Sequence, residues 1–232
     1  MFWKQKSPQN PPEDPTLLVI GGTGRLGREV IRQALSRGYN VRAITRDLNK
    51  ISSFEEGQVE WQQCDVLNKE CVQKAAEGRN TIISSICPQN REPTKLFSDS
   101  FRVLAEVMKE KKIQRFLTVT YDWDNPSNSW FTQNILKRLY KSSRNDMGLF
   151  ENMLEMRPKD HVQWTCVKTF NINQGQSPEK IKVEASYSQS SYTPEIYTTD
   201  LANFILNEAK ERKWVRKFVT VGLEPKNTAS NQ

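Results

Sequence analysis

The chain has 232 residues, with 34 Lys and Arg against 27 Asp and Glu, which gives a net charge of +7. This length suits one large α/β domain, which we expect over residues 16–224. The basic residues are scattered, so they favour a solvated basic surface over a nucleic-acid site. No run approaches the roughly 20 apolar residues that cross a bilayer, and no signal peptide is evident.

The two ends of the chain differ from the rest. Residues 1–15 carry Pro, Gln, Lys and Asn with few apolar residues, and they predict a flexible arm that could dock on a protein partner. Residues 225–232 predict a frayed tail for the same reason. The domain between them is expected to work in the cytoplasm or another reducing, soluble compartment.

Four cysteines occur without a CxxC pair: Cys64, Cys71, Cys87 and Cys166. With His161 as the one histidine, they offer too few ligands for zinc, so no metal is expected. Cys87 and Cys166 lie in apolar runs and are interpreted as buried thiols.

Short apolar runs alternate with helix-like stretches along the chain. The expected strands are 16–20, 40–46, 59–62, 80–86, 113–120, 162–168 and 217–221. The expected helices are 25–37, 69–76, 94–111, 145–156 and 201–209. This alternation predicts an α/β fold, a single doubly wound Rossmann-type domain with a mainly parallel sheet and helices on both faces.

The stretch 121–143 is long, polar and dotted with aromatic residues, and it predicts a functional loop. It begins where the fifth strand ends, which is the edge at which ligands bind in doubly wound folds.

The first strand runs directly into Gly21-Gly22-Thr23-Gly24-Arg25-Leu26-Gly27, and a helix follows. In this context the glycines predict a dinucleotide site. Gly21 would permit the tight turn, Gly24 would let the backbone approach the pyrophosphate, and Gly27 would allow close packing of helix on strand. The N–H groups of the helix start would meet the phosphate charge.

Two positions favour NADP(H) over NAD(H). The second strand ends at Thr45-Arg46 rather than at an acidic residue, and a guanidinium pairs well with a 2′-phosphate. Arg25, inside the turn, could flank the same phosphate. Asp47 leaves the NAD alternative open, because its carboxylate could instead serve a ribose.

The run from Val19 to Asp47, with its Gly-Gly-Thr-Gly core, resembles the atypical branch of the short-chain dehydrogenase/reductase superfamily. From about Leu17 to Val221 the chain is similar to the biliverdin reductase B and flavin reductase type, and to NmrA-like proteins. The shorter supporting matches are Cys64 to Leu67, Thr81 to Ile86, Trp123 to Pro126, and Thr199 to Leu201 near Phe204.

The resemblance implies further site residues. Asp65 and Val66 would contact the adenine, although Asp65 could equally be a loop carboxylate. Ile86 and Cys87 would line the cofactor, and Thr120 would anchor the nicotinamide ribose. Trp123 would contribute to a substrate pocket.

The chain departs from the family pattern at the catalytic positions. It has no Tyr-x-x-x-Lys pair, and Tyr140 begins a Tyr-x-x-x-Arg sequence instead. The serine that the relatives keep after the fifth strand matches Tyr121, and a pocket histidine matches Asn171. Tyr121 could donate a proton to the substrate or simply pack the pocket wall.

We therefore expect an NADPH-dependent reductase of a flat, conjugated acceptor such as a flavin, a linear tetrapyrrole or a quinone, by direct hydride transfer. The alternative is a protein without catalysis, either a redox sensor that binds NADP(H) or a structural or assembly subunit of a larger complex.

Overall fold

The computed structural model describes residues 14–51, 57–88, 92–123, 130–157, 162–169, 171–177, 180–185 and 195–224. The expected arm up to residue 13, the tail 225–232, His161 and the matched residues Asp124 to Pro126 lie outside these ranges.

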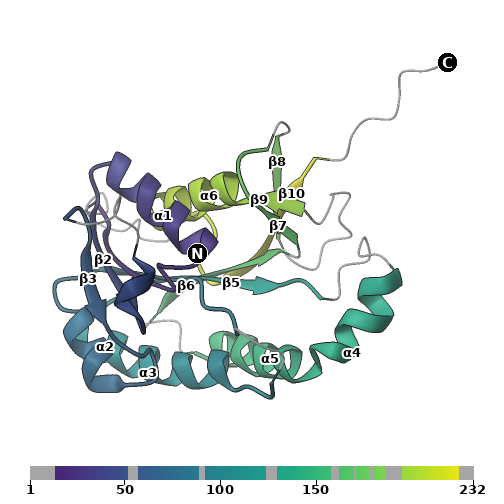
Figure 1. Ribbon diagram of the computed structural model, residues 1–232, viewed down its shortest axis with the longest axis horizontal. Coiled ribbons are helices and arrows are strands. Elements are labelled where there is room, and N and C mark those ends of the chain that lie inside the picture. Colours follow the sequence, from purple (N-terminus) through teal and green to yellow (C-terminus); the bar gives the residue numbers. More distant parts are fainter. Residues whose placement is uncertain are drawn as a thin grey trace, which may run out of the picture.

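The described strands build an eight-stranded sheet in the order β3-β2-β1-β4-β5-β6-β10-β8, and a two-stranded sheet of β7 and β9 (Figure 1). The strands are β1 (Thr16–Ile20), β2 (Asn40–Thr45), β3 (Glu60–Gln63), β4 (Thr81–Ser84), β5 (Arg115–Tyr121), β6 (Gln163–Thr169), β7 (Asn171–Asn173), β8 (Ile181–Ala185), β9 (Glu195–Tyr197) and β10 (Lys217–Leu223). Every pair in the large sheet is parallel except β10 with β8. The predicted doubly wound, mainly parallel fold is confirmed.

Helices cover both faces of the sheet. One face carries α1 (Arg25–Ser36) and α6 (Thr198–Glu211), and the other carries α2 (Lys69–Ala75), α3 (Leu96–Lys111) and α5 (Lys141–Glu155) (Figure 1). The strands alternate between two apolar cores accordingly: Leu18 and Ile20 of β1 pack toward α3, whereas Leu17 and Val19 pack toward α1. A strand buried on both faces reads as an unbroken apolar run, which is why β1 was recognisable in the sequence.

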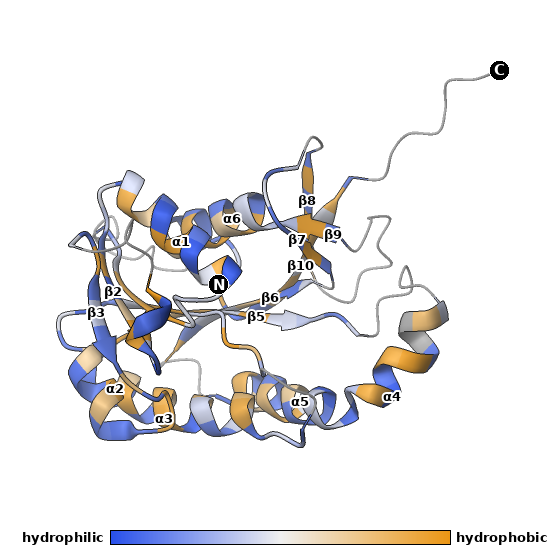
Figure 2. Ribbon diagram, viewed as in Figure 1, coloured by the Kyte–Doolittle hydropathy of each residue, from blue (hydrophilic) through white to orange (hydrophobic). Residues whose placement is uncertain are grey.

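The expected loop 121–143 is partly helical, which corrects the sequence prediction. Residues 130–139 form a helix, which we call the 130–139 helix; it includes a π-helical turn (Thr132–Leu136) and ends in α4 (Lys137–Leu139). It projects from the body beside α5, and Figure 2 shows apolar residues along it.

Other boundaries also moved. α5 begins at Lys141 and α6 at Thr198, each a few residues before the predicted start, because their first turns are polar and carry no apolar stripe. The short strands β7, β8 and β9 were not predicted at all. Each has only three to five residues and lacks the unbroken apolar run that marked β1.

None of the helices in the described ranges is long and apolar enough to span a membrane. The feature that matters for function is the order of the strands. From β1 the chain adds β2 and β3 on one side and β4, β5 and β6 on the other, so that the crossover helices diverge and leave a crevice at the carboxyl ends of β1 and β4.

Candidate functional site

A cavity of about 610 Å³ lies at the carboxyl ends of β1, β2 and β4. It brings together many of the residues that the sequence predicted for cofactor binding: Gly21, Thr23, Gly24, Arg46, Asp65, Val66, Ile86 and Cys87. It also includes residues that sequence reasoning missed, among them Thr45, Lys50, Ser85 and Leu96. We call this cavity the cofactor cleft.

The glycine turn has the geometry that its sequence predicted. Gly21 has a φ of +82°, and a Cβ there would lie 2.9 Å from the carbonyl oxygen of Ser85. A Cβ on Gly27 would lie 2.1 Å from the carbonyl oxygen of Gly21. Both positions therefore exclude any side chain, which lets α1 start directly against β1.

The amino end of α1 faces the cleft without a side-chain cap. Its N-cap residue is Gly24, no side chain accepts a hydrogen bond there, and the first turn carries no acidic residue. Free N–H groups and the positive end of the helix dipole suit an anion. These features fit the pyrophosphate of a dinucleotide.

The end of the cleft at β2 is basic. Arg46 and Lys50 both line it, and Lys50 stands on the short 3₁₀ turn η1 (Leu48–Lys50). The Asp47 carboxylate accepts the backbone N–H of Asn49 at 3.0 Å and so caps this turn. Asp47 also lines the cleft, and this hydrogen bond engages one of its two carboxylate oxygens, so the NAD alternative stays open. Lys50 was visible in the sequence four residues after Arg46, but only the 3₁₀ turn η1 shows that it lines the same end of the cleft.

The glycine turn and η1 are tied together by Arg28. Its guanidinium donates to the carbonyl oxygen of Thr23 at 3.1 Å and to that of Lys50. These two hydrogen bonds fix the position of the glycine turn relative to η1 at the basic end of the cleft.

Asp65 and Val66 line the cleft just after β3. The Asp65 carboxylate accepts the N–H of Leu67 at 2.9 Å, so it also orders its own loop. This hydrogen bond fits the interpretation of Asp65 as a loop carboxylate, and its contact with the adenine stays a prediction.

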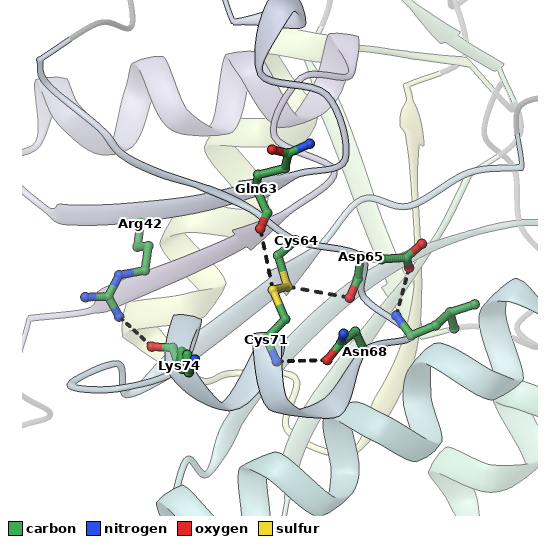
Figure 3. The surroundings of a disulfide bond; sticks show 8 residues. Arg42, Gln63, Cys64, Asp65, Asn68, Cys71 and Lys74 are labelled. Carbon is green, nitrogen blue, oxygen red and sulfur yellow. Dashed lines mark hydrogen bonds between the residues drawn. A yellow bond between two sulfur atoms is a disulfide. The ribbon is translucent and has the colours of Figure 1, made fainter.

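A disulfide joins Cys64, which lines the cleft, to Cys71 in α2 (Figure 3). Their Cα atoms lie 5.8 Å apart, within the usual span of a disulfide. The sequence did not predict this pairing. The bridge closes the loop that carries Asp65 and Val66, and the Asn68 side chain within the loop caps α2 by accepting the N–H of Cys71 at 3.0 Å.

The two remaining cysteines are free, and they differ. Cys166 is fully buried, as expected, and burial raises the pKa of its thiol. Cys87 is exposed, which corrects the prediction of a buried thiol. It follows the end of β4 and reaches the surface of the cleft, because the apolar run stops at Ser84.

A second cavity of about 250 Å³ adjoins the cleft and shares Cys87 and Pro88 with it. We call it the aromatic cavity. It is lined by Cys87, Pro88, Phe97, Tyr121, Trp123, Leu136, Tyr140, Ser143 and Met147. The rings of Trp123 and Tyr140 stack with their centroids 5.7 Å apart, and Tyr121 lies 5.5 Å from Trp123.

Tyr121 lines the aromatic cavity and contacts Cys87, which the aromatic cavity shares with the cofactor cleft. Its hydroxyl lies 3.7 Å from the Cys87 sulfur. Burial raises the pKa of Tyr121, the neighbouring Cys87 raises it further, and the positive charge of Arg25 opposes the shift. The phenol therefore stays protonated at neutral pH and can donate a hydrogen bond. Arg25, which the sequence predicted beside the 2′-phosphate, is not among the residues that line the cofactor cleft, and its charge acts on Tyr121 instead.

Some predicted residues lie elsewhere. Thr120 is buried, and its hydroxyl donates to Glu151 at 2.9 Å instead of lining the cleft. Asn171 is exposed in β7 and lines none of these cavities. Leu26 is buried in the core beneath α1.

The hydroxyl of Thr120, which is next to Tyr121 in the sequence, belongs to a polar cluster with Glu151 and Lys168. Glu151 accepts from Thr120 and pairs with Lys168 at 3.0 Å. Burial acts to lower the pKa of Lys168, but the charge and hydrogen bond of Glu151 outweigh it and the pKa is raised. Lys168 is thus a cation at neutral pH, beside a polar cavity of about 500 Å³ that also touches Tyr121 and Trp123.

Among curated proteins, the chain is similar to photosystem II assembly factor Ycf39 of Cyanophora paradoxa, with 30% identity over 105 residues. That match covers 44% of this chain and 33% of the relative. Divinyl chlorophyllide a 8-vinyl-reductase of Arabidopsis thaliana is 25% identical over 114 residues, 44% of this chain and 26% of that protein. The matched part thus spans a third or less of the length of these relatives.

Solved structures share the fold. An epimerase-like protein from Bacteroides thetaiotaomicron has a TM-score of 0.75 at 18% identity, covering 92% of this chain and 99% of its own. A protein assigned as an NADH-flavin reductase from Streptococcus pneumoniae has a TM-score of 0.71 at 17% identity, covering 90% and 100%. A short-chain dehydrogenase/reductase from Veillonella parvula in complex with NADP has a TM-score of 0.67 at 12% identity, covering 90% and 98%.

A family model described as NAD(P)H-binding matches residues 21–212, which include the glycine turn, the cleft and both helical faces of the sheet. The match extends over most of the chain. The protein therefore belongs to the NAD(P)H-binding family and has a Rossmann-type fold.

Proposed function

We propose that the protein is an NADPH-dependent reductase that transfers hydride to a flat, conjugated acceptor held in the aromatic cavity. The observation that carries this proposal is the contact between the two cavities, which share Cys87 and Pro88. NADPH, when bound, supplies the hydride. An acceptor ring in the aromatic cavity would lie directly beside the end of the cofactor cleft.

The chain's own residues would position the acceptor. Trp123 and Tyr140 offer ring faces, and Phe97 closes the apolar wall. Tyr121 would hold its proton at the hydroxyl and donate a hydrogen bond to a carbonyl or ring nitrogen of the acceptor. The cavity volume of about 250 Å³ is below the roughly 300–1,000 Å³ of drug-sized sites, which favours a single ring system such as a quinone.

The test is NADPH oxidation by the purified protein with a quinone, FMN and a linear tetrapyrrole. We expect turnover with at least one of them, and a fall in kcat of about tenfold or more in Tyr121→Phe. Tyr39→Phe is the matched control and should leave the rate unchanged, because Tyr39 precedes β2 and lines none of these cavities. Since the pKa of Tyr121 is raised, the rate should not change through loss of its proton between about pH 6 and pH 9.

A second candidate function is NADP(H) binding without turnover, in the assembly of a larger complex. It is favoured by the similarity to assembly factors of the Ycf39 type and by the missing Tyr-x-x-x-Lys pair. Tight NADPH binding with no oxidation across the whole panel would select this candidate and reject the reductase.

A further inference from the structure

An apolar stripe lies on the outer side of the 130–139 helix. Phe131, Ile135 and Leu139 follow one another at intervals of four residues and therefore share one helical face, and Trp130 precedes them. These side chains are 51%, 36%, 47% and 72% exposed, respectively. Together they form what we call the apolar stripe.

Another side of the same helix, about 100° around its axis, is already occupied. Leu136 and Tyr140 pack against the core and line the aromatic cavity. Leu136 and Tyr140 therefore attach the helix to the protein core, and the apolar stripe is not needed for that packing. Figure 2 shows that this helix projects at the rim of the molecule.

Basic residues accompany the apolar stripe. Between Trp130 and Asn145 the sequence has Lys137, Arg138, Lys141 and Arg144, and no acidic residue. Arg138 and Lys141 are exposed. A surface with aromatic and aliphatic side chains beside cations is complementary to an anionic lipid headgroup layer, with its acyl chains beneath.

Two other occupants fit less well. Stable protein interfaces engage about 20–30 residues on each side, and a stripe of four side chains is far smaller. A second copy of this chain would also bring two sets of like charges together. A lipid surface needs only a few inserted side chains with cations at the headgroups, so it is the occupant that the observations favour.

We propose that the apolar stripe and its neighbouring cations dock the protein on the surface of an anionic membrane. The 130–139 helix would lie in the plane of the interface, with Trp130 and Phe131 among the headgroups and upper acyl chains. Docking is peripheral and independent of the proposed reductase activity.

The experiment is co-sedimentation of the full chain with vesicles of phosphatidylcholine, with and without about 30 mol % phosphatidylglycerol. We expect binding to the anionic vesicles, about tenfold or more above the neutral ones, and weaker binding as salt is raised. No sedimentation with anionic vesicles, or equal binding to both kinds, would overturn the proposal.

Matched variants locate the surface. Trp130→Ser with Phe131→Ser should weaken binding about tenfold or more, whereas Leu48→Ser with Met156→Ser, which alters exposed apolar residues elsewhere, should not. Arg138→Gln with Lys141→Gln should also weaken binding about tenfold, in contrast to Lys109→Gln with Lys112→Gln at the end of α3. Equal effects of test and control pairs would overturn the assignment to this helix.

A third measurement separates lipid from protein. If sedimentation velocity shows a dimer that Trp130→Ser with Phe131→Ser abolishes, the apolar stripe is an interface between copies and the lipid proposal fails. Quenching of Trp130 by brominated lipid, lost in Trp130→Phe while sedimentation persists, would place this side chain in the bilayer surface.

Discussion

Gly27 has the least room of the described glycines, since a Cβ there would meet the Gly21 carbonyl oxygen at 2.1 Å. To make room for a side chain, α1 would have to move away from β1, which would open the core between them. We expect Gly27→Ala to lower the free energy of unfolding by about 2–4 kcal/mol and to abolish NADPH binding. Urea denaturation and a nucleotide titration measure the two effects.

Gly148 supplies the control for that prediction. It lies inside α5, and a Cβ there would meet nothing within 4 Å. Gly148→Ala should therefore stabilise the protein by about 0.5–1 kcal/mol through helix propensity. Equal stability of the two variants would contradict the steric account of the turn.

At the residue scale, the predicted preference for NADPH depends on Arg46 and Lys50. Both line the cleft at the end of β2, where a 2′-phosphate would lie, and the Asp47 carboxylate is engaged by Asn49. We expect NADPH to bind about tenfold or more tightly than NADH, a preference of roughly 1.4 kcal/mol. Arg46→Ala and Lys50→Ala should each reduce it.

The measurement is a titration that follows cofactor fluorescence. Arg102→Ala, which removes an exposed arginine of α3 far from the cleft, should bind both nucleotides as the wild type does. Equal affinity for NADPH and NADH in the wild type would exclude a 2′-phosphate site.

At the scale of elements, the loop between β3 and α2 depends on a covalent bond. The Cys64–Cys71 disulfide closes this short loop, which carries two residues of the cleft (Figure 3). A bridge over a loop of this length stabilises by about 2–3 kcal/mol through the unfolded chain. We expect Cys71→Ser to lower stability by that amount under oxidising conditions.

The same variant should also loosen nucleotide binding, because Asp65 and Val66 would be held less firmly. A thiol assay on the unfolded protein, before and after reduction, checks the bridge itself. If dithiothreitol destabilises Cys71→Ser as much as the wild type, the loss has another source.

Contacts between elements explain why the start of α3 and the 130–139 helix could not be predicted exactly. The start of α3 is held by a residue of α5, since Asp146 accepts the N–H groups of Phe97 and Ser98 at 2.8 and 3.2 Å. A cap that lies about fifty residues away leaves no local signal. The 130–139 helix was expected as a loop for a similar reason, because Leu136 and Tyr140 find their partners on other elements.

At the scale of the whole molecule, a buried ion pair ties the sheet to α6. Arg115, at the start of β5, pairs with Glu208 at 2.9 Å, and both side chains are buried. Burial lowers the pKa of Arg115 to about 10 although Glu208 opposes the shift, so the guanidinium remains a cation at neutral pH. Glu208 also accepts the backbone N–H groups of Lys213 and Trp214.

We expect Glu208→Ala to cost about 3–5 kcal/mol of stability, because it leaves a buried guanidinium without its counter-charge. Adding Arg115→Met should recover part of that loss, since the unpaired charge is removed while the two backbone N–H groups stay unsatisfied. Thermal denaturation of both variants gives the comparison. Similar stability of the single and double variants would show that the charge is not the cause.

The sequence by itself determined the fold class, the cofactor turn and the approximate order of strands and helices. These features depend on neighbours in the chain: Gly21 and Gly27 are steric requirements within one turn, and β1 is a continuous apolar run. Arg46 was recognisable for the same reason, by its place at the end of β2.

The tertiary structure alone decided the aromatic cavity, the Cys64–Cys71 bridge and the surroundings of Tyr121 and Thr120. Tyr121 and Thr120 are adjacent in β5, yet one faces two cavities and the other faces Glu151. Successive residues of a strand point to opposite sides, and what each meets there comes from helices far along the chain. Contacts between residues far apart in the chain leave no local sequence pattern, so only the folded structure shows them.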